Sequence, residues 1–211
     1  MNTPCVNDMT LSITLLHIVF QVIFRLGYAN PLDFYFSPHF IIHNYEIHRL
    51  YCCNYYSESS LPIFLFQLYI FYKVATKIED THYYDTPGSF LFLSFYVHIG
   101  AVISGFIEPE PDMFSRNLLT FLFLYCKLFS NSSIGINKIY TYTIPLTFLP
   151  FAYLAFEFIF LPESRNVAKL FIFFWSHLYF VIRFMPSTGT RFLQAPLWLD
   201  QFLLKLFMAM G

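Results

Sequence analysis

His177 is the residue whose setting first suggests chemistry. It lies inside an aromatic and apolar run, FFWSHLYFVIRFMP, at residues 173–186. A protonatable ring within hydrocarbon is costly and usually faces protein or water. As the base of an intramembrane serine protease, it would need a serine nucleophile on another span. The run RNLLTFLFLYCKLF, residues 116–129, offers Thr120 and Cys126 but no serine in a Gly-x-Ser setting.

Other serines are poor nucleophile candidates as well. Ser176 is the neighbour of His177, and adjacent residues on a helix point about 100° apart. Ser94 and Ser104 lie in an apolar run without a glycine-rich oxyanion environment. We therefore expect no catalytic residue, and expect His177 to be a buried polar residue that contacts a neighbouring span. An active intramembrane protease remains the alternative.

Histidines and cysteines do not form a recognisable metal motif. His39 and His43 have the i, i+4 spacing that places two rings on one helix face, and His48 follows. No HExxH motif accompanies them, and the four cysteines show no CxxC spacing. We expect neither a metal nor a cofactor.

Glu157 is the only acidic residue deep in an apolar segment. Paired acids within spans would favour a transporter or channel, and a single acid gives that reading little support. Glu157 is either a buried proton-linked group or a partner of another helix, and the second reading is favoured.

Composition places these residues in a membrane protein. The 211 residues are 57% hydrophobic and only 12% charged, with a mean hydropathy of +0.54. So few charges cannot cover a water-facing surface, since a soluble domain carries about 25%. The net charge of −1 gives no support for nucleic-acid binding. The chain is therefore predicted to be an all-α, multi-pass membrane protein.

Six apolar segments approach the length of about 20 residues that a membrane-spanning helix needs. They are residues 10–27, 61–75, 89–107, 118–129, 144–161 and 167–185. The second and fourth are short, which predicts local thinning of the bilayer. Residues 28–60 mix aromatic residues, prolines and histidines, a pattern typical of short helices that lie in the membrane interface.

Lys and Arg positions favour cytosolic placement of both chain ends. With that orientation the cytosolic side holds Lys73, Lys77, Lys127, Lys138, Arg183, Arg191 and Lys205. The opposite side holds Arg49, Arg116, Arg165 and Lys169. The cytosolic side thus carries seven of these Lys and Arg residues and the opposite side four, which agrees with the positive-inside rule.

Several of these stretches resemble the derlins, the Der1-like branch of the rhomboid superfamily. The resemblance runs from Asn30 to Trp198 and is carried by NPLDFYFSPHFIIHNYEIHRL, LPIFLFQLYIFYKVATKIE, FLPFAYLAFEFIF and SHLYFVIRFMPSTGTRFLQAPLWL. It implies a six-transmembrane-helix rhomboid-like bundle over residues 1–200, with interfacial helices in the first loop. Residues 201–211 would form a short cytosolic tail, as an amphipathic helix on the membrane.

The resemblance also implies positions for functional residues. His48 and Arg49 occupy the place of a Trp-Arg pair in the first, lumenal loop of derlins. There the arginine would bind lipid phosphate or acidic partners. Gln67 falls where rhomboid-like folds carry a polar amide, and His177 falls at the catalytic histidine. With Glu157, these two residues would line an intramembrane polar groove.

Two further positions of the resemblance concern the last span. Gly189 and Arg191 match the turn after it, and Pro196 matches the following short segment. Derlins carry a Gly-x-x-x-Gly pair before the histidine, where this chain has Ile172 and Ser176. We therefore expect looser packing of the last span by that route.

The function that the resemblance implies is that of a pseudoprotease in the endoplasmic reticulum membrane. Such a protein assists retrotranslocation of misfolded proteins for degradation, offering a lateral groove in a thinned bilayer. Its partners would be misfolded substrates, a ubiquitin ligase complex and a cytosolic AAA unfoldase, the last contacted indirectly. The protein could form either homo-oligomers or hetero-oligomers, and the sequence does not distinguish between them.

Overall fold

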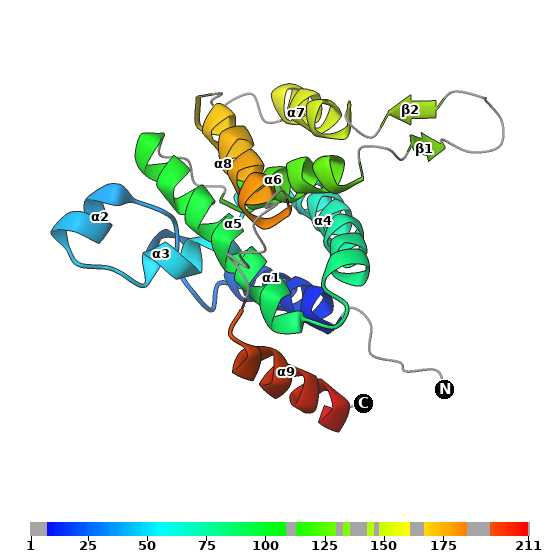
Figure 1. The fold of residues 1–211 in the computed structure, drawn as a ribbon. Helices are drawn as coiled ribbons and strands as arrows, with labels where there is room; N and C mark the ends of the chain where they lie inside the picture. The colour runs from blue at the N-terminus through cyan, green and yellow to red at the C-terminus, as the bar shows by residue number, and fades with distance from the viewer. Residues whose placement is uncertain are drawn as a thin grey trace.

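The protein is described here from a computed structural model, which covers residues 8–108, 113–129, 133–135, 143–145, 148–160, 167–184 and 195–210. These residues are mainly helical, and helices from distant parts of the sequence pack around one central helix (Figure 1). The expected all-α class holds except for one short two-stranded ribbon.

The longer helices fall where most of the apolar segments were expected. They are α1 Asp8–Arg25, α4 Leu61–His82, α5 Pro87–Ile107, α6 Met113–Leu128, α7 Leu149–Phe160 and α8 Val167–Phe184. Among the described residues, α4 and α5 are long and apolar enough to cross a membrane, whereas α1 and α7 are shorter apolar helices. Six spans therefore remain a prediction.

Three of the expected segment boundaries are wrong, those of the second, fourth and fifth segments. The second segment was expected to end at Ala75, but α4 continues to His82 and has 22 residues. Its polar last turns stay helical because Val74, Ala75, Ile78 and Glu79 are buried against the bundle. The fifth segment was expected to begin at Ile144, but α7 begins at Leu149.

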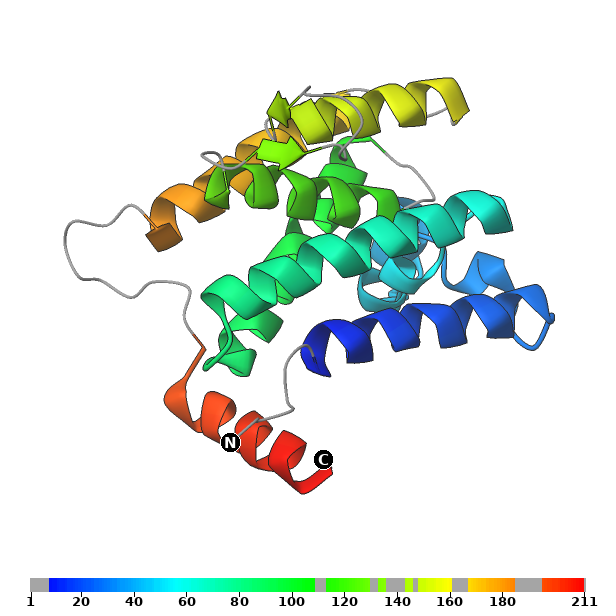
Figure 2. The same ribbon diagram turned by 90° about the vertical axis from the view of Figure 1, so that its right-hand side faces the viewer.

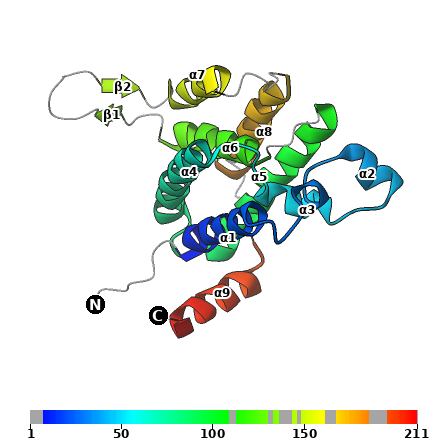
Figure 3. The ribbon, with the colours of Figure 1, turned by 180° about the vertical axis from the view of Figure 1, so that it is seen from behind.

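The first residues of that expected segment belong instead to a small antiparallel ribbon. Strand β1 Ser133–Gly135 pairs with β2 Thr143–Pro145, with Ile134 opposite Ile144. The ribbon lies beside α7, on the other side of the bundle from α2 and α3 (Figure 3). The short elements of the first loop are η1 Pro31–Asp33, α2 Pro38–His43, α3 Arg49–Cys52 and η2 Cys53–Tyr55.

The central helix is α6, which packs against α4, α5, α7 and α8. Every side chain of its first three turns is buried, including those of Arg116 and Asn117. Arg116 donates to the Ser104 hydroxyl at 2.8 Å and to the Glu108 carbonyl at 2.7 Å. Its guanidinium therefore satisfies the C-terminal end of α5, which would otherwise leave carbonyls without donors.

Carboxylates from distant segments cap the start of three helices. Glu79 accepts from the Met9 and Thr10 amides at 3.3 and 3.0 Å, at the start of α1. Asp200 accepts from the Ser89 amide at 3.1 Å in the first turn of α5. Glu108 accepts from the Ala168 amide at 3.0 Å in the first turn of α8. Each satisfies an orphan amide and favours the helix dipole.

Helices α5 and α8 approach closely through a glycine on α5. A Cβ on Gly100 would overlap Cδ1 of Trp175, so the indole occupies the space of a side chain. The Trp175 indole donates to the Tyr96 carbonyl at 3.0 Å, and the two rings stack at 4.6 Å. The small residue that permits this packing is on the partner helix rather than at Ile172 or Ser176.

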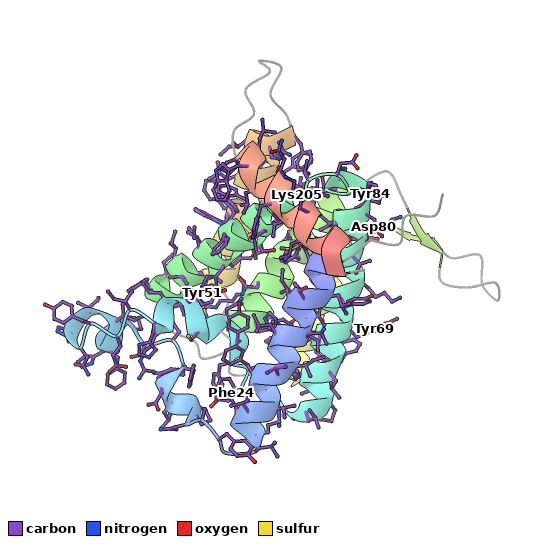
Figure 4. The ribbon with its side chains drawn as sticks, turned by 90° about the horizontal axis from the view of Figure 1, so that it is seen from below. Phe24, Tyr51, Tyr69, Asp80, Tyr84 and Lys205 are labelled. Carbon is purple, nitrogen blue, oxygen red and sulfur yellow. The ribbon has the colours of Figure 1, made fainter. Side chains whose placement is uncertain are left out.

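The C-terminal helix, α9 Leu197–Met210, lies at the end of the bundle where α1 and α5 begin (Figure 2). Figure 4 shows Lys205 of α9 at the same end as Asp80 and Tyr84, beside the end of α4. Asp200 and Leu203 of α9 are buried, whereas Trp198 is 68% exposed. The predicted tail segment is therefore helical, with one side held on the bundle.

Candidate functional site

Gln67 joins α4 to α7 in the interior of the protein. Its side chain is fully buried, and its amide nitrogen donates to the Tyr153 hydroxyl at 3.1 Å. Its amide oxygen accepts from the Ser59 hydroxyl at 3.5 Å. The ring of Phe66, next to Gln67, packs on the ring of Phe156 with centroids 4.9 Å apart. The seam between α4 and α7 therefore consists of aromatic contacts around one buried amide.

Glu157 lies one helical turn after Tyr153, on the same side of α7. It is 1% exposed and forms an ion pair with Lys169 of α8, with 2.8 Å between Oε2 and Nζ. The favoured sequence interpretation, a partner on another helix, is confirmed. Lys169, which was counted on the lumenal side, belongs to the first turn of α8, and its side chain is buried.

His177 does not join Gln67 and Glu157, and the expectation that it is buried is wrong. Its side chain is exposed on the surface of α8. The buried face of that helix is formed by Ala168, Lys169, Ile172, Ser176 and Tyr179. His177 follows Ser176 and so points away from this face.

Hydroxyl groups near the expected catalytic position are engaged in their own helices. Ser176 donates to the Ile172 carbonyl at 2.7 Å, and Thr120 donates to the Arg116 carbonyl at 3.0 Å. Helix α6 begins five residues before the expected segment, at Met113, and therefore includes Ser115 in its first turn, where the side chain is buried. The exposed His177 ring and the Ser176 hydroxyl point to different sides of α8.

The His48-Arg49 pair organises the first loop from within. Arg49 is 4% exposed; it donates to the carbonyls of Leu32 and Tyr35 and forms an ion pair with Glu46. Its guanidinium also lies over the Phe40 ring, 4.9 Å from the centroid. Of the two kinds of partner expected for Arg49, the acidic one is present within the loop as Glu46, and the 4% exposure of the side chain disfavours contact with lipid phosphate.

His48 stabilises the same loop, and Arg49 lowers the pKa of its ion-pair partner, Glu46. The Nε2 atom of His48 donates to the Asp33 carbonyl at 3.2 Å. The hydrogen bond from Arg49 holds the pKa of the Glu46 carboxyl below its usual value of 4.5. This pair therefore acts as a structural clamp on the loop.

The remaining sequence predictions concern the segment after α8 and the metal ligands. Pro196 precedes α9, and its carbonyl accepts from the Leu199 amide at 2.9 Å. Gly189 and Arg191 lie outside the described residues.

His39 and His43 face one another with ring centroids 4.7 Å apart. Among the residues that the structure covers, no three His, Cys, Asp or Glu side chains form a group that could hold a metal.

Sequence reasoning missed Tyr153 and Lys169, which complete the polar site with Gln67 and Glu157. Tyr153 and Glu157 share the i, i+4 spacing, which is a usable signal for one helix face. Lys169 gave no such signal, because its proximity to Glu157 depends on how α7 and α8 pack. The polar groups of this site come from three helices and bury two opposite charges together.

Comparison with known proteins gives a consistent result. A model of the Der1-like family matches residues 6–197. The chain is similar to Derlin-1 of Mus musculus, with 23% identity over 192 residues, 88% of this chain and 75% of that protein. Derlin-2 of Oryza sativa subsp. japonica is 25% identical over 182 residues, with 81% and 72% covered. Derlin-1 of Drosophila melanogaster is 27% identical over 141 residues, with 65% and 56% covered.

Proposed function

Because the chain belongs to the Der1-like family, we propose that it assists retrotranslocation of misfolded proteins for endoplasmic-reticulum-associated degradation. In this proposal it is a multi-pass protein of the endoplasmic reticulum membrane with both termini cytosolic. It acts without proteolysis, which is in keeping with the exposed His177 ring and with Ser176 bonded to the Ile172 carbonyl.

The observation that carries the mechanism is the unequal polar attachment of α7 to two of its neighbours, α8 and α4. On the α8 side, α7 is held by the buried Glu157–Lys169 ion pair, and breaking such a pair costs about 3–5 kcal/mol. On the α4 side the buried polar link is the Gln67–Tyr153 hydrogen bond, and leaving one of its buried partners unpaired costs about 1–3 kcal/mol. The α4–α7 seam is therefore the side that opens.

Opening this seam would give a polypeptide a polar path from the membrane into the bundle. A backbone amide that lacks a partner in hydrocarbon costs several kcal/mol. Separation of α4 from α7 breaks the bond between the Gln67 amide and the Tyr153 hydroxyl, and in the proposal both groups exchange it for bonds with the substrate backbone. The groove of the proposal is thus lined by Gln67, Tyr153 and Glu157, and not by His177.

Helix lengths support thinning of the bilayer next to this seam. At 1.5 Å per residue, α6 is about 24 Å long and α7 about 18 Å, against a hydrocarbon core of about 30 Å. Helix α4 is about 33 Å long and needs no such adjustment, so α6 and α7 replace the second span as the source of mismatch.

A cross-link across the seam tests the mechanism. Gln67→Cys with Tyr153→Cys, in a background where Cys5, Cys52, Cys53 and Cys126 are serine, is joined by a short thiol cross-linker in microsomes. Each variant is expressed in cells that lack the endogenous protein. In these cells the half-life of a misfolded lumenal reporter is measured by cycloheximide chase, and microsomes prepared from them are used to measure export of the reporter after cross-linking. The cross-linked microsomes should retain the reporter, and each single-cysteine variant treated alike should export it.

Other results would count against the proposal. An unchanged reporter half-life on depletion would remove the retrotranslocation function itself. Equal export with the seam closed would remove the lateral path. Cleavage of a transmembrane substrate by the purified protein, lost in His177→Ala, would instead establish a protease. In the proposed pathway the motive force comes from a ubiquitin ligase complex and a cytosolic AAA unfoldase, reached through another subunit.

A further inference from the structure

A second polar site lies in the bundle, between α1, η2, α5 and α6. It surrounds a partly open cavity of about 30 Å³. Four polar side chains line it, one from each of these elements: His17, Asn54, Ser94 and Asn117. The remaining lining residues are aliphatic or phenylalanine. None of the four belongs to the α4–α7 seam.

Two acceptor atoms in this cavity have no donor among the described residues. The Nδ1 atom of His17 lies 2.8 Å from the Ile13 carbonyl, so Nδ1 carries the proton and Nε2 is left as an acceptor. The Asn117 amide nitrogen donates to the Asn54 side chain, which leaves Oδ1 of Asn117 as the second acceptor. Both atoms are buried without a hydrogen bond, and their residues are 2% and 5% exposed.

The chemistry of the lining restricts what can bind there. Two acceptors require a hydrogen-bond donor, which excludes an anion. A metal or ammonium cation would lack charge compensation, since no carboxylate lines the cavity. A water-sized space of about 10–15 Å³ per molecule gives room for about two waters. Water can donate to Nε2 and Oδ1 at once and accept from neither, which matches the two unmet acceptors.

We propose that this cavity is a built hydration site, in which ordered water donates to His17 Nε2 and Asn117 Oδ1 and thereby bonds α1 to α6. Ser94 adds a lone pair for a second water, because its own hydroxyl proton is donated to the Phe90 carbonyl at 3.2 Å. His17 is held there as a neutral, Nδ1-protonated ring. The site does not depend on the proposed function.

Solid-state NMR of the full chain in liposomes, with ¹⁵N-labelled histidine, tests this site. The His17 resonances are identified by their loss in His17→Phe. The expected result is an unprotonated Nε2 with magnetisation transfer from water protons, and a protonated Nδ1. In Asn117→Leu, which fills the cavity with an apolar side chain, that transfer should disappear, while His177→Gln should leave it unchanged.

A second variant covers the event that Asn117→Leu does not fold. Asn117→Ser keeps a hydroxyl and enlarges the space, so transfer from water to Nε2 should persist. The proposal is overturned by a dry Nε2 in the native protein. It is also overturned by a proton on Nε2, which would show that the ring donates to the nearby Asn54 backbone instead of accepting from water. Sodium-dependent shifts of the His17 resonances would show a cation site and would equally refute it.

Discussion

Arg49 illustrates how one buried cation can fix a loop that has little regular structure. The guanidinium serves two carbonyls, one carboxylate and one aromatic face, from four separate points of residues 32–46. Its planar fork allows this, whereas a lysine ammonium is a single charged point. The arginine thus holds the first loop together from inside and contributes to stability rather than to lipid binding.

We expect Arg49→Lys to lower the free energy of unfolding by about 2 kcal/mol, because at least one buried acceptor loses its donor. Thermal unfolding in detergent micelles measures the change. Arg25→Lys is the matched control, since exposed Arg25 makes a single bond to the Ser59 carbonyl at 2.8 Å that a lysine can keep. An equal loss in both variants would contradict the role given to Arg49.

The Glu46–Arg49 pair should make the first loop sensitive to acid. Because the pKa of folded Glu46 is below its usual value of 4.5, the ionised carboxylate stabilises the folded state above that value. This contribution is lost as the pH falls through the folded pKa. Melting temperatures from pH 7 down to pH 3 should therefore fall more steeply for the native protein than for Glu46→Gln. Parallel curves would show that the pair has no such effect.

At this scale the sequence identified some residues and misplaced others. Glu157 could be identified because one acid in an apolar run needs a partner, and Gln67 because the resemblance marked it. The burial of His177 could not be judged, because a helix that is apolar on all sides does not reveal which face packs inward. Arg49 was misread since its four partners lie at loop positions that no periodicity relates.

Among the elements, helix positions were predictable and helix ends less so. The expected sixth segment, residues 167–185, matches α8 within one residue, because its apolar run stops at a proline. The second segment ended too early because its last turns are polar, although they pack on the bundle. The caps by Glu79 and Asp200 join residues about 70 and 110 positions apart, and no local pattern marks such pairs.

Gly100 makes a sharp prediction for the packing of α5 on α8. Gly100→Ala should destabilise the protein by about 1–3 kcal/mol, the usual cost of overpacking, because the new methyl group meets the Trp175 indole. Chemical unfolding followed by tryptophan fluorescence measures it. Adding Trp175→Leu to Gly100→Ala should recover part of the loss, and full tolerance of alanine at this position would refute the close approach.

For the whole molecule, the uneven helix lengths predict a preference for thin membranes. In proteoliposomes of short-, medium- and long-chain phosphatidylcholines, the melting temperature should fall as the chains lengthen, since α6 and α7 span less than the hydrocarbon core. A chain-length series on a variant with α7 extended by one turn at Phe160 should shift the optimum toward thicker bilayers. A melting temperature independent of lipid would show that the bundle imposes no thinning.

The enclosure of the first three turns of α6 has a consequence for how the chain is made. A segment that carries Arg116, Asn117 and Lys127 is a poor candidate for release into lipid by itself, since charged and strongly polar residues oppose insertion. Arg116 donates to the Ser104 hydroxyl of α5 and to the Glu108 carbonyl just after it, so pairing of α5 with α6 as a hairpin satisfies hydrogen-bond donors of the buried guanidinium. During biosynthesis the two segments should therefore leave the insertion machinery together, with α5, which is synthesised first, retained there until α6 has followed and the two helices can pair.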